Sequence, residues 1–378
     1  MSMPFNGERL REARRFRQLS ISQLAEKVDV SKQMISKYER NDAQPSPGTY
    51  QKIVLTLGFP LSFFKYEDKF LYNDLGTFYR SRLSSTQSEK KPSEILKKYL
   101  AVLANFLEKY VDFPALQDLE LPEDPAIAAK VLREKWNLND DPISNMLHLL
   151  EFHGFQIAAI NSNSEKVDAF GSQTRVNGTS YYCILIDQDN NSFYRQQFSL
   201  AHELAHWALH SKYINPQELD AQEYREMEKQ ANIFASNFLL PAEAFSKDIK
   251  GQEDDLNAYL KLKSKWEVSA ASMVYRSKSL GLISADQYLR LQKRMSSRGW
   301  KRNEPFDAVH PVPKPILMKQ AYELLVQADI IGSETFTDLL TKQYGISIPN
   351  DILAGLLGIP LESLIEKSRG NIVQLKRF

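Results

Sequence analysis

The stretch Phe198-Ser199-Leu200-Ala201-His202-Glu203-Leu204-Ala205-His206-Trp207-Ala208-Leu209-His210 combines a helical pattern with three histidines. Residues 193–210 contain no Gly or Pro, and their apolar residues recur at helical spacing, which predicts a partly buried helix. On that helix His202 and His206 lie on one face, so both imidazoles can reach a single metal ion. Glu203 is then placed to act as a general base on a water molecule. This arrangement is typical of zinc peptidases.

The residues before this helix predict a strand and a turn. Residues 181–186, Tyr-Tyr-Cys-Ile-Leu-Ile, are aromatic, apolar and β-branched, as strands are. Residues 187–192 are Asp, Gln, Asn and Ser, which predict a turn and supply a cap for the next helix. A second strand at 154–160 completes a small sheet. We expect the strand at 181–186 to lie at a sheet edge, where an extended substrate could pair with it by β-augmentation.

A zinc site needs a third ligand from the protein. His210 follows His202 by eight residues, about 12 Å along the helix axis, so it cannot bind the same ion. The metzincin class of zinc peptidases requires Gly three residues after the second His and another His three residues later. Leu209 and Lys212 occupy those positions, so this class is excluded.

The helix expected over residues 223–240 offers a carboxylate ligand. Glu228 and Asn232 are four residues apart and therefore share one face of this helix. We expect Glu228 to coordinate the metal and Asn232 to accept the ring N–H of a ligand histidine, as groups behind a metal ligand do. Glu223 and Glu226 are alternatives to Glu228 that spacing alone leaves open.

Together these segments resemble the ImmA/IrrE metallopeptidases, a family of bacterial and phage regulators of which some cleave transcriptional repressors. The resemblance covers roughly residues 125–305. Carried over residue by residue, it implies His202, His206 and Glu228 as metal ligands and Glu203 as the catalytic base. The segments that carry it are 198–210, Glu228-Lys229-Gln230-Ala231-Asn232-Ile233-Phe234-Ala235, Leu239-Leu240-Pro241, Glu151-Phe152-His153-Gly154-Phe155, Val167-Asp168-Ala169-Phe170, Trp266-Glu267-Val268-Ser269 and Gly299-Trp300.

The N-terminus carries a second, independent pattern. Residues 7–17 predict an Arg-rich amphipathic helix. Ser20 can cap a short helix that ends near Val28, and Ser31 can cap the next one, which runs from Lys32 to Glu39. Two short helices joined by a tight turn make a helix-turn-helix.

Residues 6–65 resemble the Xre-type (Cro/C1-like) DNA-binding domain through Leu24-Ala25, Ile35-Ser36 and Tyr38-Glu39-Arg40. The resemblance implies that the second of the two helices reads base edges and phosphates of double-stranded operator DNA. The residues placed for this contact are Lys32, Gln33, Ser36 and Lys37.

Two positions depart from the Xre pattern. Ile21 stands where the family often has a Gln that contacts DNA. Asn41 replaces the usual Gly after the recognition helix, although Asn also tolerates the left-handed conformation. Residues 1–60 contain ten Lys/Arg and six Asp/Glu, whereas the whole chain has a net charge of +1, so positive charge is concentrated where phosphates would be met.

Composition indicates an ordinary globular protein of the cytoplasm. The chain has 378 residues, 43% hydrophobic and 25% charged, which is enough for two or three domains. Its single cysteine, Cys183, excludes an internal disulfide framework and suits a reducing compartment. No signal peptide opens the chain and no stretch approaches the ~20 apolar residues of a membrane span, so no membrane contact is expected.

The expected fold class is multidomain α+β. Residues 1–68 form an all-α helix-turn-helix domain, 69–125 a helical linker region with a loop at 83–94 and a helix at 93–110. Residues 126–305 form an α+β zincin-like peptidase core with a small sheet. Residues 306–378 form a helical C-terminal region of unknown role, with helices near 315–329, 334–344 and 349–368. Within it, Leu357-Gly358-Ile359-Pro360-Leu361 echoes Leu57-Gly58-Phe59-Pro60-Leu61.

The combined pattern predicts a DNA-binding transcriptional regulator with a Zn²⁺-dependent endopeptidase domain. Its substrate would be a regulatory protein, either a partner repressor or the chain itself, in a phage or stress response. The alternative is a non-enzymatic repressor or antitoxin whose metal domain senses a signal or a partner. His153, Tyr213 and His310 are candidates for stabilising an oxyanion. Because Xre-type domains usually bind two half-sites, we expect a homodimer.

Overall fold

The computed structural model describes residues 5–79, 87–160, 169–187, 192–211, 218–301, 303–331 and 335–365. Its N-terminal part consists of α1 (Gly7–Phe16), α2 (Ile21–Lys27), α3 (Lys32–Glu39), α4 (Pro47–Leu57) and the 3₁₀ turn η1 (Leu61–Phe64). The hydroxyls of Ser20 and Ser31 accept hydrogen bonds from Gln23 N and Met34 N, so they cap α2 and α3. These helices therefore begin where the sequence predicts.

Gly7 and Asn41 fix how α1 meets the end of α3. A Cβ atom at Gly7 would lie 1.9 Å from the carbonyl oxygen of Tyr38, so only glycine allows this approach. Asn41 adopts a left-handed φ of 61°, and its Oδ1 accepts a hydrogen bond from Gly7 N at 2.7 Å. Asn41 thus supplies the conformation usually given by Gly and also holds α1 in place.

Four strands form one mixed sheet in the order β1-β3-β4-β2. They are β1 (Tyr72–Tyr79), β2 (Gln156–Ile160), β3 (Ala169–Val176) and β4 (Thr179–Asp187). β3 runs antiparallel to both β1 and β4, while β2 runs parallel to β4. Asn177 and Gly178, with φ of 50° and 90°, join β3 to β4 in a two-residue hairpin turn.

The expectation that the strand before the motif helix lies at a sheet edge is wrong. β4 pairs with β3 on one side and β2 on the other, so its backbone groups are not available to a substrate. The physical reason is visible in its composition, because an apolar run buried on both faces is typical of a central strand. The edge next to β3 is taken by β1, a strand that the sequence patterns did not predict.

The sheet separates two hydrophobic cores. Along β4, Tyr181, Cys183 and Leu185 enter one core, whereas the alternate residues Tyr182, Ile184 and Ile186 enter the other. We call the first the N-terminal core, because it extends through residues such as Leu10, Tyr99 and Leu356. We call the second the motif core, because it contains Leu132, Leu204 and Met273.

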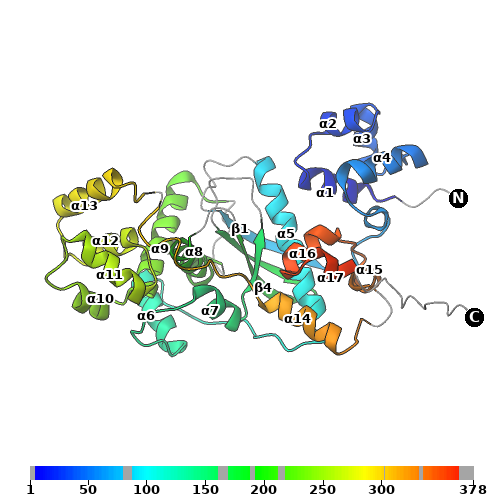
Figure 1. The fold of residues 1–378 in the computed structure, drawn as a ribbon. Coiled ribbons are helices and arrows are strands. Elements are labelled where there is room, and N and C mark those ends of the chain that lie inside the picture. The colour runs from blue at the N-terminus through cyan, green and yellow to red at the C-terminus, as the bar shows by residue number, and fades with distance from the viewer. Residues whose placement is uncertain are drawn as a thin grey trace, which may run out of the picture.

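Helices from the middle of the chain cover the motif-core face. They are α6 (Pro125–Lys135), α7 (Met146–Phe152), α8 (Phe193–Ala205) with the π-helical turn η2 (His206–His210), α9 (Ala221–Leu239), α10 (Ala242–Ile249), α11 (Leu256–Trp266), α12 (Ala270–Ser279) and α13 (Ala285–Ser297). α8 packs on β3 and on α9, and α9 packs on α6. Figure 1 shows α10–α13 at the end of the molecule farthest from α1–α4.

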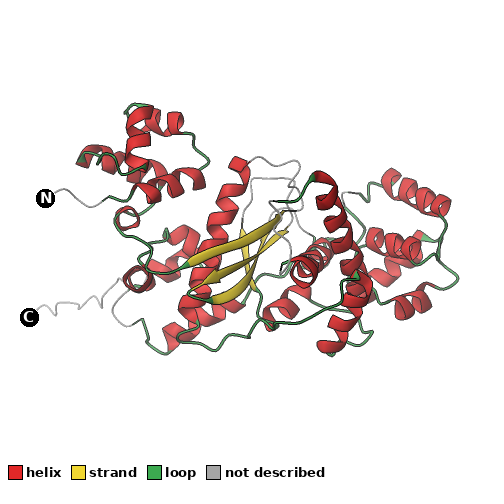
Figure 2. Cartoon of the chain, turned by 180° about the vertical axis from the view of Figure 1, so that it is seen from behind, coloured by secondary structure: helices red, strands yellow, loops and turns green. Residues whose placement is uncertain are grey.

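The opposite face is covered by α5 and by the C-terminal helices. These are α5 (Gln87–Leu107), α14 (Leu317–Gln327), α15 (Phe336–Tyr344), α16 (Asn350–Leu357) and α17 (Leu361–Ile365). α5 packs on β2, β3 and β4, and α16 packs beside β2. Figure 2 shows helices on both sides of the sheet.

Two predicted boundaries need correction. The loop expected over residues 83–94 is helical from Gln87, with Pro92 in the second turn of α5; residues 81–86 lie outside the described part. The helix expected over 349–368 ends at Leu357, because Gly358 takes a left-handed φ of 67° as its C-cap. Gly58 caps α4 in the same way with a φ of 64°, so the repeated five-residue pattern marks the same local structure twice.

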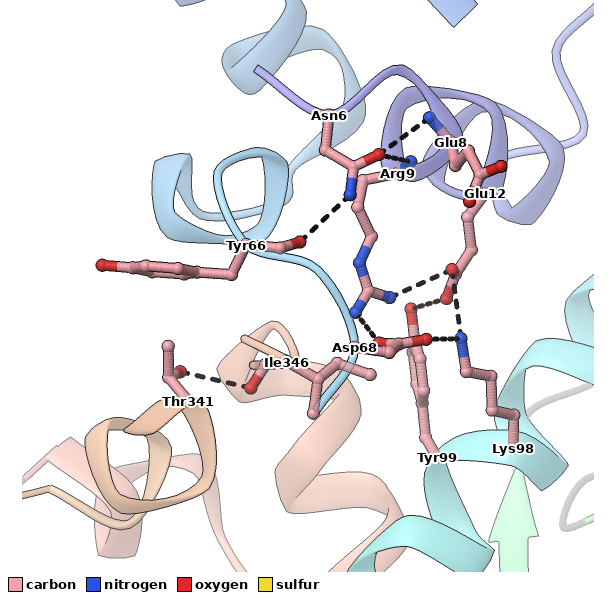
Figure 3. A network of polar contacts seen from close by, with 10 residues as sticks. All are labelled: Asn6, Glu8, Arg9, Glu12, Tyr66, Asp68, Lys98, Tyr99, Thr341 and Ile346. Atoms are coloured by element: carbon pink, nitrogen blue, oxygen red, sulfur yellow. Dashed lines mark hydrogen bonds and ion pairs between the residues drawn. The ribbon is translucent and has the colours of Figure 1, made fainter. Parts of the chain in front are cut away.

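The N-terminal helices are joined to α5 by a partly buried polar network (Figure 3). On α1, Arg9 pairs with Glu12 at 3.1 Å and with Asp68 of the segment that follows η1. On α5, Lys98 pairs with Asp68 at 2.9 Å and with Glu12 at 3.4 Å, while the Tyr99 hydroxyl donates to Glu12 at 2.8 Å. Two cations thus neutralise two carboxylates, and α1 shares one core with the sheet instead of forming a separate lobe.

Candidate metal centre and nucleic-acid interface

Helices α8 and α9 bring three potential ligands to one point. His202 Nε2 lies 3.3 Å from Glu228 Oε2, and His206 Nε2 lies 3.4 Å from Glu228 Oε1. The two histidine Nε2 atoms are 3.1 Å apart. One ligand atom from each residue can be chosen so that all lie within 4.8 Å of one another, which is the convergence that a metal ion needs.

Burial keeps His206 neutral. His202 and His206 are 1% and 0% exposed, and burial lowers the pKa of His206 to about 4. Burial by itself would raise the pKa of Glu228, but the close contacts with His202 and His206 outweigh that effect and lower the pKa below the ordinary value. Near neutral pH the cluster therefore presents a neutral imidazole of His206 and an ionised carboxylate, which is a donor set suited to Zn²⁺.

His210 lies behind His206 and fixes its tautomer. His210 Nε2 lies 3.1 Å from Gln230 Oε1, so this nitrogen carries the proton and donates to the amide oxygen. Burial, reinforced by the nearby His206, lowers the pKa of His210 to about 3, so its other nitrogen, Nδ1, is an acceptor. His206 Nδ1, 3.1 Å away, must then be the donor. The lone pair of His206 consequently resides on Nε2, the atom that faces Glu228.

The sequence excluded His210 as a ligand, and the structure gives it this supporting position. In the sequence, this position of His210 is indicated by its four-residue spacing from His206, which repeats the spacing of the two motif histidines. Residues 206–210 form a π turn, a local widening that is frequent at functional sites. The partner Gln230 follows from the packing of α9 on this turn.

Glu203 of α8 is 1% exposed, and its side chain packs against β3. A Cβ atom at Gly171 of β3 would lie 2.7 Å from Glu203 Oε2 and 2.8 Å from the Tyr182 hydroxyl. The Tyr182 hydroxyl donates to the backbone oxygen of Glu203 at 3.3 Å. Glycine at position 171 therefore makes room for the carboxylate, a requirement that the sequence patterns did not identify.

The other acidic and polar candidates on α9 take different positions. Glu223 accepts a hydrogen bond from Asp220 N and closes a capping box at the start of the helix. Glu226 is paired with Lys229 on the surface. Asn232 Nδ2 donates to the backbone oxygen of Glu228 at 2.8 Å. In the described part of the chain, Asn232 therefore bonds to the helix backbone. The side chain that lies behind a motif histidine is that of His210.

The candidates for an oxyanion partner lie elsewhere or outside the described residues. His153 stacks on Trp136 with ring centroids 3.8 Å apart. His310 stacks on Phe193, more than two helical turns before the first motif histidine. Tyr213 is outside the described part of the chain.

The surface of α3 matches the interface expected for DNA. Lys32, Gln33 and Lys37 are exposed and Ser36 is partly exposed, while Ile35 is fully buried. Buried Glu39 at the end of α3 binds Arg14 of α1 through two hydrogen bonds of 2.5 and 3.0 Å. The helix is thus held from behind and presents its polar side outward.

Comparison with known families agrees with this division. A family model described as a helix-turn-helix matches residues 10–64, and one described as an IrrE N-terminal-like domain matches residues 150–278. A search among curated proteins finds no match. Among the described helices, none is long and apolar enough to cross a membrane. The chain joins an Xre-type helix-turn-helix domain to a metallopeptidase-like domain of the ImmA/IrrE family.

Proposed function

We propose that this protein is a cytoplasmic transcriptional regulator that binds operator DNA and hydrolyses a peptide bond in a regulatory protein, either a partner repressor or a copy of itself. The observation that carries this proposal is the convergence of His202, His206 and Glu228 beside Glu203, in a chain that also has a DNA-binding domain. A digestive peptidase would not need the DNA-binding part.

The three converging residues would hold Zn²⁺ through His202 Nε2, His206 Nε2 and the Glu228 carboxylate. When bound, zinc supplies a Lewis acid that polarises a carbonyl and makes water more acidic. The Glu203 carboxylate removes a proton from the attacking water and delivers it to the leaving amine. His210 and Gln230 keep His206 in the tautomer whose Nε2 lone pair faces the ion.

For DNA, Lys32, Gln33, Ser36 and Lys37 form the contact surface. The amide of Gln33 can read a base edge, and the lysines neutralise phosphates. A homodimer would place two such helices on two half-sites. Cleavage of the partner repressor or of the chain itself would then separate DNA binding from repression.

Zinc content and cleavage in three forms of the full-length chain test the enzymatic half. Wild type and Glu203→Gln should each hold one zinc per chain, whereas Glu228→Ala should lose it. Cleavage of candidate repressors, and of the chain itself, should fall on the order of 10²–10⁴-fold in Glu203→Gln, because a general base contributes that much. If wild type holds zinc but cuts neither kind of substrate, the enzymatic half of the proposal is wrong.

DNA binding is tested separately with the promoter of the protein's own gene. Gln33→Ala combined with Lys37→Ala should weaken binding on the order of tenfold or more, because a base contact and a phosphate contact are both lost. Lys135→Ala, which removes an exposed charge on α6, is the control and should bind normally. Equal affinity of all three proteins would refute the assignment of α3.

A further inference from the structure

Strand β1 lies outside the matched peptidase-like region and belongs to the connection between the two domains. The IrrE-like match begins at residue 150, and the three strands within it are β2, β3 and β4. In that set β3 would be an edge strand, with one row of backbone groups unpaired. β1, from residues 72–79, fills this edge as an antiparallel fourth strand.

The edge that β1 fills is the one beside the catalytic carboxylate. Glu203 packs directly on Gly171 of β3, and Phe78 of β1 is the residue paired with Gly171 in the ladder. Antiparallel partners have Cα atoms about 4.5–5.5 Å apart, so the β1 backbone runs one strand spacing from the residue that touches Glu203. An extended substrate pairing with β3 would need this same position.

We propose that β1 is an internal occupant of the substrate-binding edge, and that the site accepts an extended peptide antiparallel to β3 only when the end of β1 leaves. This inference rests on the proposed peptidase function and names the class of ligand and its regulation. Glu203 is 1% exposed in the described structure, so something must move before a peptide can reach it. A peptide added to the outer edge of β1 would lie a further ~4.8 Å away.

A bulge divides β1 into two halves, and the second half is the one that lies beside Glu203. The ladder register shifts between Asp74 and Thr77, a bulge that divides the strand. Before the bulge, Asp74 pairs with buried Lys97 at 3.7 Å and accepts from the Ser172 hydroxyl at 3.3 Å, and Leu71 is bonded to Asn177. After the bulge, residues 77–79 are aligned with 170–172, beside Glu203. Release of residues 77–79 therefore opens the edge while the first half stays anchored.

The anchored half of β1 continues from a segment that contacts the DNA-binding part. The segment between η1 and β1 contains Asp68, which is bound to Arg9 of α1 and Lys98 of α5 (Figure 3). The same segment is fixed to the C-terminal helices, since Lys69 N donates to Tyr344 O at 2.9 Å. The first half of β1 is therefore held by a segment that belongs to the same network that orients α1.

The test uses the full-length chain with Glu203→Gln, so that no peptide is cut. Thr77→Pro with Phe78→Pro removes two consecutive amide donors, one of which faces β3, and so opens the edge. Thr77→Ala with Phe78→Ala is the matched control, which shortens both side chains and keeps both amides. The probe is a fluorescein-labelled peptide with the sequence of residues 71–79, measured by fluorescence anisotropy, together with hydrogen exchange of residues 169–176.

In the proline variant, amides of residues 170–172 should exchange faster, the peptide should bind at least tenfold more tightly than to the alanine control, and binding should restore protection. Equal peptide binding by the two variants would overturn the proposal, and so would an exposed β3 that binds no peptide. Because neither readout needs catalysis, peptide binding without any cleavage activity would leave this inference standing while the enzymatic function fails.

A second variant tests the same point if the proline variant fails to fold. Thr77→Cys with Ser172→Cys, in a Cys183→Ala background, places thiols on a paired position of β1 and β3 after the bulge, within the Cα separation that a disulfide tolerates. Cys183 is replaced because it pairs with position 172 in the β3–β4 ladder and could compete for the new thiol. Oxidation should slow exchange at residues 170–172 relative to the reduced chain. Identical exchange in both states would mean that β1 does not leave the edge.

Discussion

Two polar clusters on opposite faces of the sheet treat charge differently. In the N-terminal core, charged side chains neutralise one another: Arg14 with Glu39, and Arg9 and Lys98 with Glu12 and Asp68. In the motif core, neutral His206 and an ionised Glu228 converge without a fixed cation of the chain among the described members of the cluster. The first cluster uses charge to hold helices together. The second assembles donors that an ion from solution would complete.

This difference separates stability from ligand binding. A buried ion pair contributes little relative to apolar packing but is costly to break. A convergent donor set gains its stability only when the ion arrives. Variants in the two cores should therefore change different observables, and the three predictions below test that separation.

The largest effect is expected in the N-terminal core from Arg14→Ala. Arg14 and Glu39 are both buried, and loss of the guanidinium leaves the Glu39 carboxylate with the partly exposed Arg11 at 3.6 Å, at a cost of about 3 kcal/mol. Chemical denaturation should show this loss, while zinc bound per chain stays the same. Arg15→Ala, an exposed neighbour, should cost little. If Arg14→Met with Glu39→Leu is as unstable as Arg14→Ala, the Glu39 carboxylate that remains without Arg14 is not the cause of the lost stability.

An intermediate effect is expected in the motif core from His210→Ala. His206 loses the acceptor that fixes its tautomer, so zinc affinity should fall about 10–100-fold, as it does when groups behind metal ligands are removed. Competition with a zinc chelator measures it, and DNA affinity should not change.

His210→Asn can still offer an oxygen acceptor and should retain most of the affinity. His148→Ala, an exposed histidine of α7, is the control for histidine loss in general. If His148→Ala and His210→Ala weaken zinc binding equally, the link from His210 to His206 has no role in holding the metal.

An effect that disappears at low pH is expected from Glu151→Gln, at a contact between α7 and the start of α14. Glu151 of α7 accepts hydrogen bonds from Ile316 N and Leu317 N at 2.9 Å, at the start of α14. Burial raises the pKa of Glu151 to about 7, although the two amides oppose this. In the unfolded chain the pKa is about 4.3.

Between these values the folded chain binds more protons than the unfolded chain. The contribution of Glu151 to the free energy of unfolding is therefore fully present at low pH. It is lost as pH rises from about 4 to about 7, with a slope of up to about 1.4 kcal/mol per pH unit. Denaturation of wild type and Glu151→Gln across this range should converge at low pH and diverge toward neutral pH. Glu134→Gln, an exposed control, should follow wild type. Parallel curves for wild type and Glu151→Gln would contradict this account.

Much of the fold and the candidate site was predictable because the relevant signals are local. Caps at Ser20 and Ser31, the tolerance of Asn41 for a left-handed φ, and the helical pattern around His202 each depend on a few adjacent residues. The helix after the motif also follows from its cap and period, and with it the position of Glu228. Val167 and Asp168, which belong to one segment of the resemblance to the ImmA/IrrE family, lie outside the described residues.

The sequence by itself determined the motif helices, the recognition helix and the residue types that can bind zinc and DNA, because spacing along a helix decides which side chains share a face. Only the tertiary structure decided that β4 is central, that β1 occupies the edge beside Glu203, and that α1 shares a core with α5. Strand order and helix docking depend on contacts between residues far apart in the chain. No local pattern records those contacts, and they are what place α1 and the motif helices in the cores on opposite faces of one sheet.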